Sequence, residues 1–289
     1  MSKKLLALHG LKWNPFSPDL PLEGLLMTPQ VEHFCWRMAT IHVREGGFAL
    51  VRGDVGTGKS VGLRLLHDRL SRERDVTVGA LEHPQCSLGD FYRELGDLFA
   101  VPLKPSNRWG GFKGLRAKWQ DHVDKRLTRP VLLVDEAQEM CAAALNELRL
   151  LSSACFDSRT LLSVVLAGDK RLDERLGHED LAPLASRIRT RLVLEPASRD
   201  ELLAYLKHVT GAAGNARLMT TELMGTLCDH ALGNYRALMT MAGDLLAAAV
   251  QREQTQLDEK LFLEVFAVPS GPKAAPPHQP AKNGAKARR

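Results

Sequence analysis

Cysteine is scarce in this chain, and its few cysteines show no pairing. The five stand at positions 35, 86, 141, 155 and 228, and no two of them form a C-x-x-C pair. The ten histidines are dispersed too, and none stands at a metal-ligand spacing from a cysteine. This pattern argues against a disulfide framework and a zinc site, and we expect buried thiols in a reducing compartment.

Long apolar runs are also missing. No stretch approaches the roughly 20 apolar residues that a membrane-spanning helix needs. The opening apolar stretch, residues 1–9, is too short for a signal peptide. We therefore expect a cytoplasmic protein with no membrane partner.

Acidic residues are absent from residues 267–289, whose five lysines and arginines account for the whole net charge of +5. This segment is rich in Pro, Ala and Gly without apolar periodicity, so we predict a disordered basic tail. The rest of the chain is formally neutral, but residues 104–129 carry four Lys and four Arg against two Asp. Basic charge is thus concentrated in two places.

What the sequence does contain begins with a complete phosphate-loop pattern, G-x-x-x-x-G-K-[ST], between a predicted buried strand at 47–51 and a predicted amphipathic helix. Backbone N–H groups and the helix dipole form an anion site in such a turn. Lys59 is expected to reach the β- and γ-phosphates, and the Ser60 hydroxyl to hold Mg²⁺. The loop residues are Gly53, Asp54, Val55, Gly56, Thr57, Gly58, Lys59 and Ser60.

A second motif consists of four aliphatic residues at 131–134 followed by Asp135 and Glu136. Such a run predicts a strand of a parallel sheet, and carboxylates at its C-terminal end face the ligand crevice. We expect Asp135 to bind Mg²⁺ and Glu136 to position or activate the water that attacks the γ-phosphate. The two motifs together predict a protein that binds ATP or GTP.

Strands and helices alternate as far as residue 195, which predicts a parallel sheet covered on both faces. The expected strands are 47–51, 76–81, 131–134, 160–167 and 191–195. After Pro196 only helices are expected, beginning with a capping box at Ser198–Glu201. We therefore divide the chain into a loop-like N-terminal segment near the nucleotide, an α/β core, a helical lid and the tail, at 1–30, 31–195, 196–266 and 267–289.

Further polar positions fit an ATPase that works as an assembly. Asp169 follows the fourth predicted strand, where an acid can orient the attacking water, although Gly-Asp is also ordinary turn chemistry. Arg236 begins a predicted helix and can fold over the γ-phosphate, or it is a surface arginine. Arg187, and after it Arg189, is a candidate arginine finger for a neighbouring subunit. The alternative is a solvated basic turn, and Arg191 can simply flank the strand.

This ordered set of motifs, over residues 10–266, resembles the AAA+ ATPases. The opening Gly10–Phe16 and the phosphate loop resemble the TnsC/TniB/ExeA-like group, which includes regulators of transposition and a secretion ATPase. The resemblance implies an AAA+ five-stranded parallel sheet with helices on both faces and a C-terminal helical lid. It identifies Asp169 as sensor-1-like and Arg236 as sensor-2-like.

The same resemblance places Asn14 and Phe16 near the nucleotide base. Many members of the group carry Gln or Asn where this chain has Asp169. The family's basic region between the second strand and the acidic motif faces the pore of a ring or helical filament, where DNA runs. Clustered basic side chains bind phosphates independently of sequence. The corresponding residues here are Lys104, Arg108, Lys113, Arg116 and Lys118.

Two alternatives stay open for this basic stretch. Its charges can be a solvated helix face, and the interleaved Trp109, Phe112 and Trp119 can pack in the core rather than stack on DNA. We expect an ATPase that binds ATP and Mg²⁺, assembles as a homo-oligomer on double-stranded DNA and directs a transposase, with a target-selector protein as a further candidate partner. The alternatives are an ATP-dependent secretion or assembly factor and a helicase loader.

Overall fold

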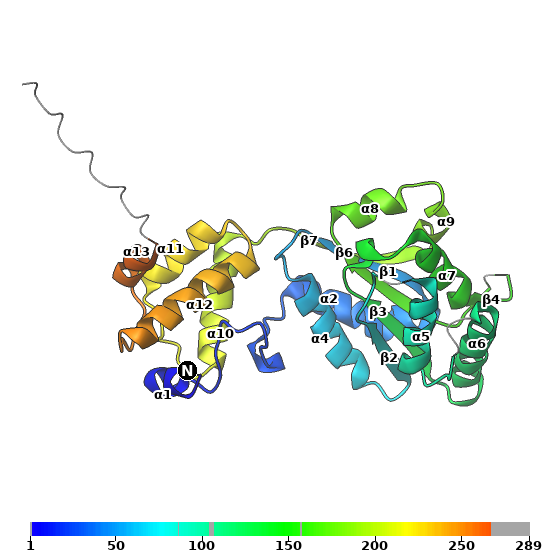
Figure 1. The fold of residues 1–289 in the computed structure, drawn as a ribbon, viewed down its shortest axis with the longest axis horizontal. Helices are drawn as coiled ribbons and strands as arrows, with labels where there is room; N and C mark the ends of the chain where they lie inside the picture. The colour runs from blue at the N-terminus through cyan, green and yellow to red at the C-terminus, as the bar shows by residue number, and fades with distance from the viewer. Residues whose placement is uncertain (1, 86, 104–106, 157, 267–289) are drawn as a thin grey trace, which may run out of the picture.

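The computed structural model describes residues 2–85, 87–103, 107–156 and 158–266. They form an α/β lobe and a smaller all-helical lobe, joined by the chain that leaves the last strand (Figure 1). The first helix of the chain lies with the helical lobe rather than with the sheet.

The α/β lobe is built on five parallel strands in the order β2-β3-β6-β1-β7, which confirms the predicted AAA+ sheet. All six residues of β6 are buried, as expected for a parallel strand covered on both faces. Because the strands are parallel, their carboxyl ends lie at one edge of the sheet. The strands are β1 Gly47–Gly53, β2 Val76–Leu81, β3 Arg129–Val134, β6 Ser163–Gly168 and β7 Ile188–Leu194.

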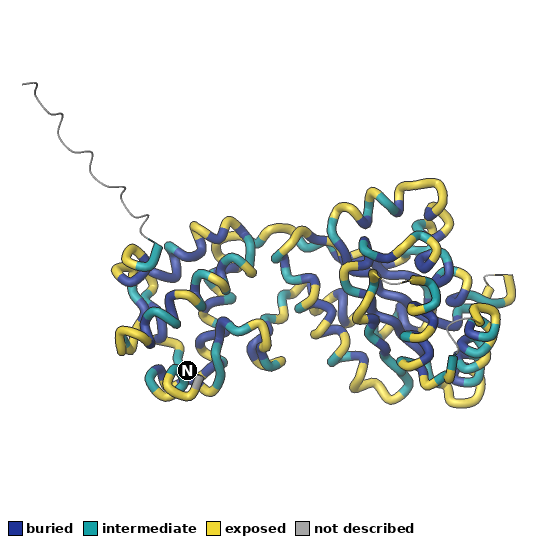
Figure 2. The backbone as a smooth tube through the Cα atoms, in the orientation of Figure 1, coloured by how far each residue is buried: buried dark blue, intermediate teal, exposed yellow. Residues whose placement is uncertain are grey.

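Helices cover both faces of the sheet, and successive strand residues pack against opposite layers. Ala49 and Val51 of β1 pack with α4, whereas Phe48 and Leu50 pack with the layer of α5, α6 and α7. The buried strands lie between these exposed helical surfaces (Figure 2). The helices of this lobe are α2 Pro29–Arg37, the π-helical η2 Met38–His42, α3 Val43–Glu45, α4 Lys59–Ser71, α5 Leu88–Leu98, α6 Arg108–Lys125, η3 Ala137–Glu139, α7 Ala142–Ser152, α8 Lys170–Leu176 and α9 Ala182–Ala185. The short helix η1, Leu22–Gly24, precedes them and contacts the helical lobe.

The helical lobe begins with the predicted capping box. The backbone N–H of Glu201 donates to the Ser198 hydroxyl over 3.3 Å, and the Ser198 N–H donates to the Glu201 carboxylate over 2.7 Å. Four helices follow, and α1 packs against one of them, α12. The helices are α1 Ser2–His9, α10 Arg199–Ala212, α11 Thr221–Ala231, α12 Tyr235–Gln251 and α13 Glu259–Phe266.

Several sequence expectations were wrong in detail. The N-terminal segment is not all loop, because residues 2–9 form α1. The expected strand 160–167 is interrupted: β5 (Arg159–Thr160) pairs with β4 (Ser153–Ala154) in a small hairpin, and β6 starts only at Ser163. Between them the chain turns, since the Leu161 N–H donates to the Ser152 carbonyl over 2.7 Å.

The last strand starts at Ile188 rather than at 191, so Arg189 and Arg191 lie within β7. The missed signal is the alternation of these two exposed arginines with the buried Thr190 and Leu192, which is typical of an edge strand. β7 pairs with β1 alone, at the edge of the sheet.

The cysteines are not uniformly buried. Cys35 and Cys228 are buried, and burial raises the pKa of the Cys35 thiol to about 11. Cys141 and Cys155 are exposed, contrary to expectation, while Cys86 lies outside the described residues. No helix in the described part of the chain is long and apolar enough to cross a bilayer.

Candidate nucleotide site

The phosphate loop joins the end of β1 to the start of α4, as the sequence predicted. Its glycines are required by the backbone. Gly56 and Gly58 have φ of +85° and +98°, in the left-handed region. A Cβ on Gly53 would lie 2.4 Å from the Thr57 hydroxyl and 2.8 Å from the Leu194 carbonyl. The loop therefore has the tight turn at a helix N-terminus that binds anions.

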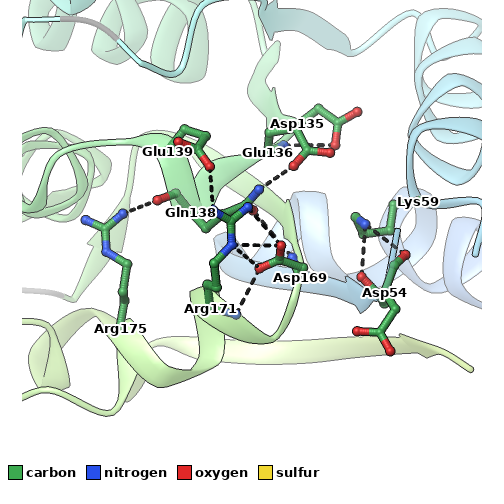
Figure 3. Close-up of polar contacts among 10 residues, drawn as sticks. Asp54, Lys59, Asp135, Glu136, Gln138, Glu139, Asp169, Arg171 and Arg175 are labelled. Atoms are coloured by element: carbon green, nitrogen blue, oxygen red, sulfur yellow. Dashed lines mark hydrogen bonds and ion pairs between the residues drawn. The ribbon is translucent and has the colours of Figure 1, made fainter. Parts of the chain in front are cut away.

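Lys59 is only 5% exposed and is held by its own loop. Its ammonium group donates to the carbonyls of Gly53 over 2.9 Å and Asp54 over 3.1 Å (Figure 3). These neutral acceptors satisfy the cation without neutralising its charge, so phosphate oxygens can replace them. A buried cation at the centre of an anion-binding turn fits the phosphates of a nucleotide.

Ser60, Asp135 and Glu136 line one cavity of about 720 Å³ at the carboxyl ends of the strands. The structure thus brings together the residues predicted for Mg²⁺ and for catalysis. A hydroxyl and a carboxylate are oxygen ligands that Mg²⁺ accepts. Glu136 has φ of +49°, a conformation that is costly for residues other than glycine and that concentrates at functional sites.

Gln138, which the sequence reasoning missed, lies between the two predicted catalytic acids. It is 5% exposed, its amide N–H donates to the Glu136 carboxylate, and its amide oxygen accepts the Asp169 backbone N–H at 3.4 Å. Only its position two residues after Glu136 in the sequence pointed to it.

Asp169 is the N-cap residue of α8. It therefore has the turn role that the sequence left open as an alternative. Its carboxylate accepts the Arg171 backbone N–H at 2.9 Å and forms an ion pair with the Arg171 side chain. Partial burial alone would raise the pKa of Asp169. The hydrogen bonds and charge of Arg171 outweigh this effect, so the pKa lies below its ordinary value. A water-orienting role for Asp169 stays a prediction.

The helical lobe, which contains the predicted lid, contacts the phosphate loop directly. The Asn234 side chain donates to the Val55 carbonyl over 3.1 Å, and the Tyr235 N–H donates to the Gly56 carbonyl over 3.0 Å. A Cβ on Gly56 would lie 2.0 Å from the Asn234 amide oxygen, so glycine permits this approach. Arg236 is exposed on the first turn of α12, directly after these two contact residues. Its sensor role stays a prediction.

An apolar cavity of about 150 Å³ adjoins the loop at Thr57 and Gly58. Its walls come from α4, residues 26–31, the end of β7 and the lid tyrosines Tyr205 and Tyr235. A mostly apolar pocket beside a phosphate site suits a flat nucleotide base.

Asn14 and Phe16 do not line this cavity. Phe16 is buried beside Gly243 of α12, and the Asn14 side chain accepts the Phe16 N–H at 3.0 Å. Thr28 and Gln30 line the cavity instead. Thr28 caps α2 directly before Pro29, a helix-start pattern that the sequence contains but that carries no functional signal.

Arg187 lies at the opposite end of the sheet from its own phosphate loop. β7 runs parallel to β1 with Ile188 opposite Phe48, whereas the loop follows Gly53. The separation along β1 is roughly 20 Å at about 3.3 Å per residue. Arg189 forms an ion pair with Glu45 at 3.8 Å. Arg187 therefore cannot reach its own loop, and a role at a neighbouring subunit stays a prediction.

Two of the predicted DNA-contacting residues hold the fold. Arg108 forms an ion pair with Glu147, whose side chain is 4% exposed and also accepts the Tyr92 hydroxyl. Arg116 donates to the carbonyls of Leu150, at 2.8 Å, and Ser153. Arg108 therefore has a buried ionic partner, whereas the carbonyl partners of Arg116 hold its side chain in place without neutralising its charge.

At the start of α6, Trp109, Phe112 and Lys113 form an aromatic and cationic surface. Trp109, 64% exposed, stacks on Phe112 at 5.7 Å, and the Lys113 ammonium lies 4.8 Å from the Trp109 ring. Lys118 is partly exposed, and Lys104 lies outside the described residues. Trp119 is fully buried, so of the alternatives left open, core packing holds for Trp119 and not for Trp109.

Comparison with known proteins agrees with this geometry. Residues 42–176 match a family model described as an AAA domain. The ORC2 protein of Aeropyrum pernix superimposes with a TM-score of 0.69 at 14% identity, over 88% of this chain and 71% of that chain. Domain III of the replication initiation protein DnaA from Thermotoga maritima gives a TM-score of 0.59 at 19% identity, over 88% and 98%. The chain has the AAA+ fold.

The AAA+ fold implies a nucleotide site at the loop described above. The sequence is also similar to a curated protein with a functional name. General secretion pathway protein A of Aeromonas hydrophila is 33% identical over 211 residues, which is 72% of this chain. The match covers only 38% of that protein's length.

Proposed function

We propose that this AAA+ chain is a Mg²⁺-dependent ATPase. The observation that supports the proposal most is the convergence of Lys59, Ser60, Asp135 and Glu136 at one edge of the sheet, beside an apolar cavity for the base. Together these side chains supply the three functions that phosphoryl transfer needs, which are phosphate binding, metal binding and positioning of the attacking water.

The residues divide the work as follows. Lys59 exchanges its two carbonyl partners for phosphate oxygens, and the loop N–H groups bind the remaining charge. Ser60 and Asp135 would hold Mg²⁺, which would supply neutralisation of the charge on the phosphates. Glu136 orients a water molecule and accepts its proton. Asn234 and Tyr235 link any movement of the loop to the lid, because they hydrogen-bond to its carbonyls.

The proposed working form is a homo-oligomer, a ring or a helical filament, with Arg187 of one subunit at the nucleotide of the next. The position of Arg187 at the far end of the sheet favours this arrangement, since it cannot serve its own site. An arginine finger supplied by a neighbour makes hydrolysis depend on assembly.

The proposed partners are double-stranded DNA and a transposase, with a target-selector protein as a further candidate partner. The support is the exposed cluster of Trp109 and Lys113 with Phe112 on α6, which combines a cation for phosphates with an aromatic pair. A second candidate is an ATPase of a secretion or assembly system, which the 33% identity to General secretion pathway protein A favours.

The test measures ATP hydrolysis and duplex DNA binding by the purified chain and by Glu136→Gln. We expect Mg²⁺-dependent hydrolysis that falls by roughly 10²-fold or more in Glu136→Gln, with nucleotide binding retained. Duplex binding should require ATP or a non-hydrolysable analogue. Hydrolysis at the parental rate in Glu136→Gln would refute the catalytic assignment. Hydrolysis without any DNA binding at low salt would favour the secretion candidate.

A further inference from the structure

The catalytic carboxylate of Glu136 is held by a buried side chain from the short helix η3. Gln138 donates its amide N–H to Glu136 and accepts the backbone N–H of Asp169 at 3.4 Å (Figure 3). The two contacts agree in polarity, because a carboxylate can only accept and a backbone N–H can only donate. They fix which end of the amide faces each partner.

The backbone of β6 is shaped to admit this amide. A Cβ on Gly168 would lie 2.6 Å from the Gln138 amide oxygen, so any larger residue would displace the side chain. The amide is therefore enclosed between Glu136 and the junction of β6 with α8. This junction carries Asp169, the N-cap residue of α8.

The helix that carries Gln138 is itself fixed to α8. Arg175 donates to the Gln138 main-chain carbonyl, and Arg171 forms an ion pair with Glu139 at 3.0 Å. These contacts hold the η3 backbone independently of the Gln138 amide. A change confined to the amide should therefore leave η3 in place while releasing Glu136.

We propose that Gln138 is a positioning residue for ATP hydrolysis, which orients the Glu136 carboxylate and ties it to the β6–α8 junction. The proposal rests on the proposed ATPase function. With one carboxylate oxygen bound by the amide, the other oxygen is left to accept from the attacking water. A free Glu136 would sample other rotamers, and misplacement of a catalytic group by about 1 Å can cost 10²-fold in rate.

Two variants test the amide. Gln138→Ala removes both of its contacts, and Gln138→Glu keeps the shape but replaces the donor with a second carboxylate facing Glu136. We expect kcat for ATP hydrolysis to fall roughly 10- to 100-fold in both, with KM and the affinity for a fluorescent ATP analogue within about twofold of the parent. Loss of an interaction that acts only on the chemical step has this pattern.

A pH series separates positioning from a structural role. At lower pH the carboxyl introduced by Gln138→Glu takes up a proton and can donate to Glu136 again. The ratio of variant to parental kcat should therefore rise as the pH falls from 8 to 6, while the ratio for Gln138→Ala stays flat. Thermal melting checks that each variant is folded. If Gln138→Ala does not fold, the isosteric Gln138→Glu decides.

The control is Gln120→Ala, which removes a glutamine that donates to Asp124 at 2.6 Å on the exposed face of α6. It should hydrolyse ATP at the parental rate. Parental kcat in both Gln138 variants, while Glu136→Gln is inactive, overturns the positioning role and leaves the ATPase proposal standing. An equal loss of kcat and nucleotide affinity, with no pH rescue, overturns it as well. A parent protein that does not hydrolyse ATP overturns both proposals.

Discussion

The nucleotide edge of the sheet was predicted from two motifs and the outer surface of α6 from clustered basic charge, and the structure holds the cations of the two regions differently. At the nucleotide edge, Lys59 is held by neutral carbonyls that an anion can replace. On α6, Arg108 is committed to the buried Glu147, and replacing it would leave a buried carboxylate without its cation. A partner that a ligand can displace indicates a binding site, whereas a buried ionic partner indicates a structural role.

The difference shows why counting basic residues overstates a DNA-binding surface. Residues 104–129 carry a formal charge of +6. Within that stretch Arg108 and Arg116 hold α6 to α7, and Lys125 pairs with Asp121 at 2.8 Å. Lys113 remains on the exposed side with Trp109 and Lys118 is partly exposed elsewhere on the helix, so the surface available to phosphates is smaller than the sequence indicated.

The largest effect should come from Lys59→Ala, which alters only the nucleotide edge. Removing the ammonium group eliminates both the charge partner of the phosphates and the contacts to Gly53 and Asp54. We expect nucleotide binding to be abolished in calorimetry, with the fold retained by circular dichroism. Nucleotide binding at parental affinity would show that the carbonyl-held lysine is structural, and the comparison between the two regions would fail.

Arg187→Ala should have the next largest effect, a loss of hydrolysis on the order of 10³-fold, because a finger residue acts on the transition state. Mixing Arg187→Ala with Lys59→Ala protein should restore part of the rate, since each variant keeps the half-site that the other lacks. The restored rate should rise with protein concentration. Unimpaired hydrolysis by Arg187→Ala alone would transfer the role to Arg189 or exclude a finger in this segment.

The sequence predicted the sheet, the phosphate loop and the acidic pair because each is a local pattern. Gln138 and Asn234 were not predicted as site residues, since their roles arise only when η3 meets the end of β6 and α12 meets the loop. The interrupted strand before β6 was missed because Leu161 and Leu162 are as apolar as the strand they precede. Contacts between distant segments, not local patterns, decide these features.

Arg108→Ala should destabilise the fold by about 1–3 kcal/mol, because the buried Glu147 carboxylate loses its cation and keeps only the Tyr92 hydroxyl. Urea unfolding measures the change in free energy. The matched control on α5 is Arg93→Ala, whose ion pair with Asp90 at 3.1 Å is exposed on both sides and should contribute within about 0.5 kcal/mol. Equal stability of the two variants would contradict the structural role of Arg108.

The smallest expected effect is on duplex DNA binding by the double variant Lys113→Glu and Lys118→Glu. Each lost phosphate contact should reduce the slope of log affinity against log salt by about 0.9, so the pair should flatten it by about 2. The affinity should fall on the order of 10-fold for all sequences, with ATP binding and stability unchanged. A salt titration with a non-hydrolysable ATP analogue measures both quantities.

The control for this last effect is the double variant Lys125→Glu and Lys260→Glu, which changes the net charge by the same amount at the far end of α6 and on the lid. If DNA passes over the exposed face of α6, the control should keep the parental slope, because long-range charge is screened beyond about 10 Å at 0.1 M salt. Equal losses in the two double variants would mean that only the overall charge matters. The α6 surface would then have no specific role in DNA binding, and the contrast between the two regions would reduce to the nucleotide edge alone.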